Sequence, residues 1–232
     1  MTLNYGNPMA MVTLWEDFTR DNVTDLVETA ANSGSQDMIS KHGGWWRQTV
    51  STGETDDVLL SAELAWEADE GFPVVFETRL VSSDVSTSAI GVYMTDANTE
   101  TNAVLPYENE DGTVASLATD LAGFLLEGEQ DETWNAVGVQ NDTDNTAVAL
   151  TLGADGVDAT VQVLRMELSP DNSGRALYYI GESVEAGGGK LVSTQTSWFR
   201  SSIVLVPMVG VNSRTTALTV DYDYLYVTAG RS

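Results

Sequence analysis

Two carboxylates near the end of the chain have a spacing that could support chemistry. Asp221 and Asp223 stand two residues apart in "VDYDYLYV", and alternate residues of a β-strand share one face about 6.6 Å apart. Inverting glycosidases hold their two carboxyl groups ~6.5–9.5 Å apart, so the spacing is compatible with a catalytic pair. The alternating pattern favours a closing strand instead, in which one aspartate is structural and the other is solvated. It predicts Thr219, Leu225 and Val227 on the face of the aspartates and Tyr222, Tyr224 and Tyr226 on the opposite face.

The sequence contains few residues that could support other catalytic or metal-binding chemistry. His42 is the single histidine and cysteine is absent, which excludes a His-based zinc site, thiolate chemistry and disulfides. There is no G-x-S-x-G nucleophile elbow, and "EAGGGK" lacks the spacing of a phosphate-binding loop. The acidic segments "DANTE" and "NDTDN" are weak calcium candidates without the pattern of an EF-hand. We therefore predict no catalytic residue, no metal site and no cofactor.

Several aromatic residues are candidates for binding. On one strand, Trp45 and Trp46 must face opposite ways, so one of them could stack a sugar or anchor an interface. The alternative is that the second tryptophan is covered by a loop or by the N-terminal residues. "TSWFRSS" leaves the same choice open, and the three tyrosines of the closing strand are either covered or form an exposed aromatic face. The candidate interface residues are Tyr5, Met9, Met11, Trp45, Trp46, Trp198 and Phe199.

The charge of the chain is strongly one-sided. Thirty-five acids face ten bases, a formal net charge of -25, and Lys41 and Lys190 are the two lysines. Such a charge destabilises the compact state at ordinary ionic strength, whereas molar salt shortens the Debye length to about 3 Å. The composition predicts a protein from a halophile, or from a virus that infects one. It also argues against binding to nucleic-acid phosphates, which requires clustered Lys and Arg.

Most of the remaining chain is predicted to form β-strands. Residues 1–12 are predicted to form an arm, residues 20–32 a short helix, and residues 13–232 a single domain. No apolar run approaches the ~18 residues that cross a bilayer, and the first residues do not resemble a cleaved signal peptide. Turn material separates runs rich in β-branched and aromatic residues, which predicts an all-β antiparallel sandwich or jelly roll. The eleven runs are "GGWWRQTV", "DVLLSAELAW", "FPVVFETRLV", "TSAIGVYMT", "LAGFLLE", "WNAVGVQ", "TAVALTL", "ATVQVLRMEL", "RALYYIG", "IVLVPMVGV" and "ALTVDYDYLYV".

Some of these segments resemble a known superfamily. "RALYYIGESVEA" resembles a hairpin of laminin-G and concanavalin-like jelly rolls, and "VDYDYLYV" resembles their closing strand. The order of "LWEDF", "GVYMTDANTE", "WNAVGVQNDTDNTA" and "PMVGVNSRTTALTVDYDYLYV" is similar to head decoration or minor capsid proteins of tailed double-stranded DNA viruses. Laminarinase-type glycosidases of this superfamily carry a Glu-x-Asp-x-Glu or Glu-x-Asp-x-x-Glu strand. "ETDDVLL" and "EADEGF" begin like that motif but lack its final glutamate.

The resemblance implies a non-enzymatic structural protein on the capsid exterior of a halophilic tailed virus. Its expected partners are the major capsid protein and further copies of itself, as a homotrimer, with no nucleic acid and no membrane. A carbohydrate-binding module or viral adhesin that binds host glycans is the alternative. A glycosidase, which would need a pair such as Asp221 and Asp223, is a third possibility.

Overall fold

A computed structural model describes most of the chain. It covers residues 11–18, 26–41, 43–53, 56–62, 65–68, 73–97, 105–110, 112–150, 155–181 and 189–230, with only the backbone of residues 11, 12 and 230. Tyr5, Met9 and His42 lie outside the described residues. Met11, at the end of the predicted arm, pairs through its backbone with Gly230. In the described part, no helix is long and apolar enough to cross a membrane.

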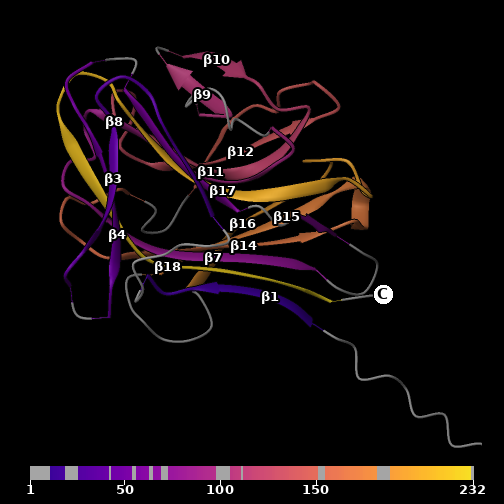
Figure 1. The fold of residues 1–232 in the computed structure, drawn as a ribbon. Coiled ribbons are helices and arrows are strands. Elements are labelled where there is room, and N and C mark those ends of the chain that lie inside the picture. Colours follow the sequence, from indigo (N-terminus) through magenta and orange to yellow (C-terminus); the bar gives the residue numbers. More distant parts are fainter. Residues whose placement is uncertain are drawn as a thin grey trace, which may run out of the picture.

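The first of two large antiparallel sheets contains the closing strand. The long strand β18 is bordered on one side by β7, and on the other by β4 along its first half and β1 along its second half (Figure 1). In order, the strands are β16 (Lys190–Gln195), β15 (Arg175–Gly181), β14 (Gln162–Ser169), β7 (Val74–Ser82), β18 (Leu218–Gly230), β4 (Trp45–Val50) and β3 (Ser35–Ile39), with β1 (Met11–Glu16) beside β18.

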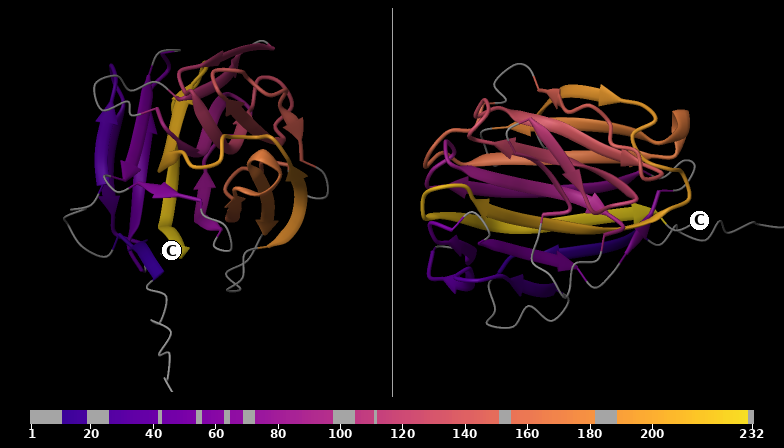
Figure 2. Two further views of the ribbon diagram at one scale, coloured as in Figure 1. Left: turned by 90° about the vertical axis from the view of Figure 1, so that its right-hand side faces the viewer. Right: turned by 90° about the horizontal axis from the view of Figure 1, so that it is seen from above.

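The second sheet lies against the first, as the two further views show (Figure 2). Its strands are β13 (Val148–Ala149), β12 (Trp134–Gln140), β11 (Asp120–Glu127), β8 (Ser88–Thr95), β17 (Val204–Ser213), β5 (Asp57–Ala62) and β2 (Leu26–Ala30), with β6 (Trp66–Glu67) beside β17. A hairpin of β9 (Tyr107–Glu110) and β10 (Thr113–Ser116) lies on the far side of this sheet, at the top of Figure 1. The predicted all-β antiparallel sandwich is confirmed.

Two local predictions are wrong. Residues 26–30, placed in a helix by the sequence, form β2 and pair with β5 from Leu26 opposite Ala62 to Ala30 opposite Val58. Pairing with a core strand outweighs the weak helical amphipathicity of this segment, as tertiary context commonly does. The run "DVLLSAELAW" is not one strand, because β5 ends at Ala62 and β6 begins at Trp66.

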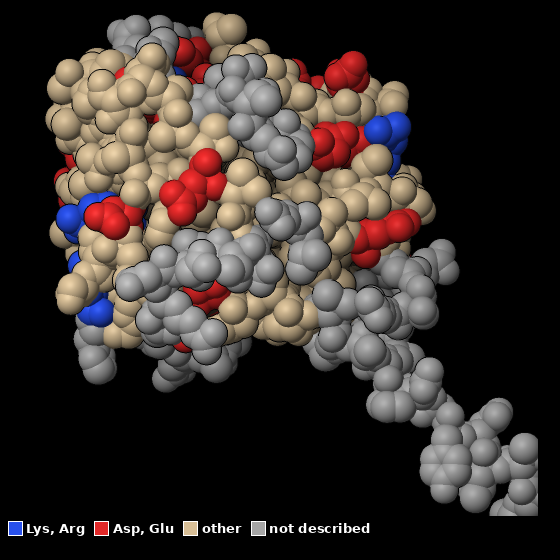
Figure 3. Space-filling view, viewed as in Figure 1, with Lys and Arg blue, Asp and Glu red and all other residues tan. Residues whose placement is uncertain are grey.

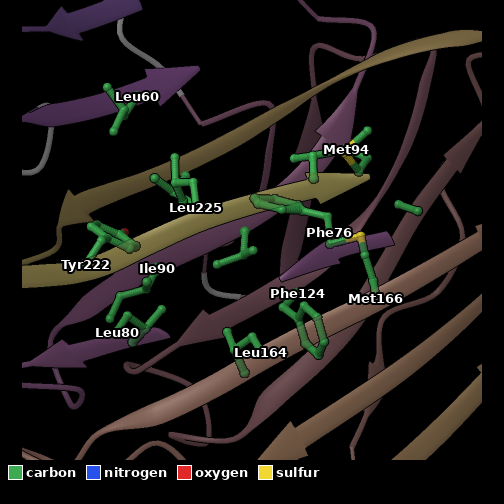
Figure 4. Close-up of a cluster of buried hydrophobic side chains, with 14 of the residues drawn as sticks. Leu60, Phe76, Leu80, Ile90, Met94, Phe124, Leu164, Met166, Tyr222 and Leu225 are labelled. Carbon is green, nitrogen blue, oxygen red and sulfur yellow. The ribbon is translucent and has the colours of Figure 1, made fainter. Parts of the chain in front are cut away.

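The main core fills the space between the two sheets (Figure 4). On β7, Phe76 and Leu80 point into this core while Glu77 and Arg79 are half-buried on the outer face. This alternation is typical of a sheet with one face in the core and one near solvent. The outer-face side chains of this strand are therefore only partly exposed.

The second sheet is covered on both faces. All eight residues of β8 and all eight of β11 are buried. Their sequences therefore do not alternate between apolar and polar residues as a half-exposed strand does. Their outward side chains form a second apolar cluster with residues from the hairpin and its flanks. The members of this cluster include Leu59, Tyr93, Leu121, Leu125 and Met208 from the sheet and Leu105, Tyr107 and Ala118 from the covering segment.

Candidate functional site

The two aspartates of the closing strand do not form a pair. A β-bulge at Asp223 shifts the register of β18 against β7, so that Tyr222 lies opposite Leu80 and Tyr224 lies opposite Arg79. A bulge adds one unpaired residue and reverses which face later residues occupy. Tyr222 therefore points into the core, whereas Tyr224 and Tyr226 are half-buried on the outer face. The predicted assignment of all three tyrosines to one face is wrong.

Each aspartate is held by its own cations. Asp221 accepts hydrogen bonds from Arg47, with Nε–Oδ1 2.6 Å and Nη2–Oδ2 2.8 Å, and it also pairs with Lys41. Burial alone would raise the pKa of Asp221, but these hydrogen bonds outweigh it and lower the pKa. Asp223 pairs with Arg79, and its side chain is 14% exposed. Neither aspartate is solvated, and both have a structural role.

The predicted aromatic candidates are mostly core residues. Trp46 packs with Phe18 at a ring-centroid distance of 5.8 Å, and Trp198 donates a hydrogen bond from Nε1 to the Val137 carbonyl at 2.7 Å. Phe199 is also buried. These three side chains are already packed inside the chain, so the structure corrects their prediction as exposed interface residues.

Trp45 occupies the outer face, as its opposition to Trp46 requires, but it is covered. Its exposure is 8%, because Lys41 and Arg79 lie over its ring, with Nζ 4.7 Å and Cζ 5.3 Å from the ring centroid. Cation–π contacts of this kind fix both cations above the ring. Trp45 therefore supports the ion pairs of Asp221 and Asp223 and offers no free stacking surface.

An exposed aromatic patch lies next to this region, formed by Trp15, Tyr224 and Tyr226. Trp15 is 56% exposed. Its ring stacks on Tyr224 with centroids 5.2 Å apart and an interplanar angle of 12°, and it meets Tyr226 edge-on at 5.5 Å. All six tryptophans lie in the described part, and the exposed fractions of the other five are 8% or less. No pattern in the sequence marks Trp15 as exposed, and its contact with Tyr224 depends on the bulge in β18.

Polar groups border the aromatic patch. The hydroxyl of Tyr224 donates a hydrogen bond to Glu77 Oε1 at 2.7 Å, which fixes the ring beneath Trp15. Burial raises the pKa of Tyr224, and the hydrogen bond to Glu77 raises it further, so the tyrosine stays protonated. Arg165 reaches Glu77 at 3.4 Å and Glu167 at 2.6 Å. A rigid ring surface thus lies beside fixed hydrogen-bond donors and acceptors.

A second polar cluster is centred on Arg214, between the second sheet and the hairpin. Its guanidinium forms two hydrogen bonds with Glu127, with Nε–Oε1 2.9 Å and Nη2–Oε2 2.7 Å. Its Nη1 atom lies 3.9 Å from Glu108 Oε2 and 3.7 Å from Glu110 Oε2. A shallow pocket of about 270 Å³ is lined by Glu108, Glu110, Thr113 and Ala115. Asn212 connects Asp57 to the cluster, because it donates a hydrogen bond from its Nδ2 to Asp57 Oδ1 at 2.9 Å.

The acids of this cluster should make stability depend on pH. Burial raises the pKa of Glu108 to about 7 and that of Asp57 to about 6, both above their values in an unfolded chain. The folded state therefore binds more protons, and stability falls as pH rises through these pKa values. We expect the free energy of unfolding to drop by about 2 kcal/mol between mildly acidic and mildly alkaline pH.

Urea unfolding at both ends of this pH range checks the expectation. Glu108→Gln should reduce the pH dependence, because the amide cannot ionise at the buried position, and the contribution of Asp57 should remain. Glu67→Gln, at an exposed position on β6, serves as the control and should leave the dependence as it is in the wild type. A pH dependence that survives Glu108→Gln unchanged would contradict this assignment.

The calcium candidates are used in other ways. Asp96 Oδ1 accepts the backbone N–H groups of Thr119 and Asp120, both at 2.9 Å, while Asn98 and Glu100 of "DANTE" lie outside the described residues. In "NDTDN", Asn145 donates a hydrogen bond from Nδ2 to the Trp198 carbonyl at 3.3 Å. Within the described ranges, no group of three His, Cys, Asp or Glu side chains is arranged to hold a metal ion.

The comparisons with known proteins concern the fold. No protein-family model and no curated protein match the sequence. A β-glucanase of Bacillus licheniformis is similar in structure, with a TM-score of 0.63 and 12% identity over 93% of this chain and 97% of that chain. A β-1,3-1,4-glucanase from a mouse hindgut metagenome has a TM-score of 0.63 and 10% identity, over 93% and 98% of the two chains. Lectin II from Ulex europaeus has a TM-score of 0.60 and 12% identity, over 95% and 99%. At these identities the likeness shows the fold alone: the chain is a concanavalin-like jelly-roll β-sandwich.

Proposed function

We propose that this protein binds carbohydrate through the aromatic patch of Trp15, Tyr224 and Tyr226. The observation that carries the proposal is the exposed Trp15 ring, which is held flat on Tyr224 rather than left mobile. A rigid ring that presents its face to solvent loses little conformational entropy when a ligand stacks on it. Glu77 and Arg165, at the border of the patch, supply an acceptor and donors for the hydroxyl groups of a sugar.

The structural likeness to lectins and glucanases supports a glycan ligand in general terms. The patch suits binding rather than turnover. Glu77 is held by Tyr224 and Arg165, and Glu167 is held by Arg165, so both carboxylates are already engaged in contacts within the chain. We therefore propose a binding protein without hydrolytic activity.

The role predicted from the sequence, a decoration protein on the exterior of a halophilic virion, stays a prediction. So does its assembly with a capsid protein or into a trimer. The fold agrees with the alternative drawn from the sequence, a carbohydrate-binding module or viral adhesin. A viral adhesin would combine the virion role with carbohydrate binding, since its glycan site would be displayed on a particle.

A glycan array with matched variants tests the proposal. Wild-type protein should bind a defined subset of glycans, and Trp15→Ala should weaken that binding by at least tenfold, which corresponds to about 1.4 kcal/mol. The fold should survive, because loss of an aromatic pair costs roughly 0.5–1.5 kcal/mol beyond buried area. Leu117→Ala removes an equally exposed apolar side chain, 59% exposed, next to the hairpin and should bind as the wild type does. Binding that persists in Trp15→Ala would contradict the proposed site.

A further inference from the structure

The strand register places six outer-face residues in one row across the first sheet. Each residue lies opposite the next on the neighbouring strand. The row runs from Trp15 on β1 through Tyr226 on β18, Glu77 on β7, Arg165 on β14 and Tyr179 on β15 to Leu191 on β16. Neighbouring strands are ~4.8 Å apart, so the distance from Trp15 to Tyr179 covers four spacings, about 19 Å. The aromatic patch is therefore one end of a longer surface.

The two ends of the row are apolar and its centre is polar. At the far end, Leu191 is 46% exposed, and the Tyr179 ring lies beneath the Arg165 guanidinium with 5.9 Å between Cζ and the ring centroid. Burial raises the pKa of Tyr179, which keeps its hydroxyl protonated and able to donate. Glu77 and Arg165 fill the centre. Apolar contact surfaces thus recur about four strand spacings apart, with hydrogen-bonding groups between them.

The row itself contains one acid, Glu77, and one base, Arg165, and the flanking Glu167, Asp223 and Arg79 bring the local count to three acids and two bases. Arg165 lies between Glu77 and Glu167, and Arg79 neutralises Asp223 beside the aromatic patch. Elsewhere acids predominate over bases, and acidic side chains are scattered over the face seen in Figure 3. A polyanion would be repelled by the net charge of -25. The carboxylates in and beside the row are each paired with an arginine, so a polycation would have to break these ion pairs, and a neutral, hydroxyl-rich ligand matches this surface best.

We propose that the row is an extended site for a neutral, linear oligosaccharide of about four or five pyranose units, lying across the strands. One sugar stacks on Trp15, another contacts Tyr179 and Leu191, and the units between them hydrogen-bond to Glu77 and Arg165. The chain length follows from the spacing, because an extended pyranose unit advances by about the width of one strand spacing. This inference rests on the proposed function and specifies the length and charge of its ligand.

Calorimetric titration with oligosaccharides of increasing length tests the inference. The probes are the di- to hexasaccharides of β-1,4-glucose, β-1,4-N-acetylglucosamine, α-1,4-glucose and β-1,4-mannose, measured in concentrated KCl. In the series that binds, affinity should rise at least tenfold from the disaccharide to the pentasaccharide and then level off. Tyr179→Ala should remove most of that gain while disaccharide binding at Trp15 stays within about twofold. Tyr179→Phe keeps the ring and should retain the gain.

The outcomes separate this inference from the proposed function. Binding that requires Trp15 but does not change with length, or that Tyr179→Ala leaves intact, overturns the extended site while the proposed function stands. Preference for a charged glycan, such as polygalacturonate over every neutral series, overturns the neutral ligand alone. Failure of all four neutral series and of charged glycans to bind the wild type overturns both.

Discussion

Replacement of Arg214 by methionine should lower the free energy of unfolding by about 3–5 kcal/mol, the usual cost of leaving a buried charge unpaired. Arg214 is 1% exposed, and its partner Glu127 is 2% exposed. Without the guanidinium, Glu127 would remain as a buried carboxylate beside Glu108 and Glu110. Equilibrium urea unfolding measures the loss, in comparison with the wild type at the same pH and salt concentration.

Two further variants make this experiment specific. Arg175→Met breaks an ion pair with Asp171 in which the side chains are 35% and 54% exposed, and it should cost less than about 1 kcal/mol. Adding Glu127→Gln to Arg214→Met removes the orphaned charge and should recover part of the lost stability. An effect of Arg214→Met as small as that of Arg175→Met would show that the cluster does not hold the hairpin region to the sheet.

Salt should stabilise the protein strongly. With a formal net charge of -25, like charges repel across the whole surface, and molar salt screens this repulsion because the Debye length shortens from about 30 Å at about 0.01 M to about 3 Å at about 1 M. We expect the thermal unfolding midpoint to rise by about 10 °C between dilute buffer and molar KCl, which corresponds to several kcal/mol for a chain of this size. Differential scanning calorimetry over a KCl series measures the shift.

A charge variant separates screening from other effects of salt. Glu67, Glu129 and Glu132 are exposed, and their joint replacement by glutamine removes three negative charges. The triple variant should be more stable than the wild type in dilute buffer and should gain less from KCl. Equal gains in both proteins would show that the effect of salt does not arise from charge repulsion.

The sequence predicted the fold class because the strand signal is local. Runs such as the one that became β7 alternate with the period of two that a half-buried strand requires. The helix predicted at residues 20–32 failed at β2, because pairing with β5 is a long-range contact that a local window does not contain. The short strands β3, β9 and β10 carry few apolar residues and gave no local signal.

The candidate site was harder to predict. A single bulged residue, Asp223, decides which tyrosines of β18 face outward, and its position depends on the register with β7. Nothing in the local sequence distinguishes Trp46 and Trp198 from Trp15. They are buried and Trp15 is exposed because of strands that are distant in the sequence. The row from Trp15 to Leu191 combines residues from six strands, so it exists only in the folded sheet. The Arg214 cluster likewise joins residues from β5, β9, β11 and the segment after β17.

Acrylamide quenching of tryptophan fluorescence, with and without a saturating oligosaccharide, tests the central claim most directly. The exposed fraction of Trp15 is 56%, whereas those of the other five tryptophans are 8% or less, so the quencher reports mainly on Trp15. We expect that bound sugar shields this ring and lowers the quenching constant towards that of Trp15→Phe. An unchanged quenching constant in the saturated protein would contradict the proposed site, because the sugar would then bind away from Trp15.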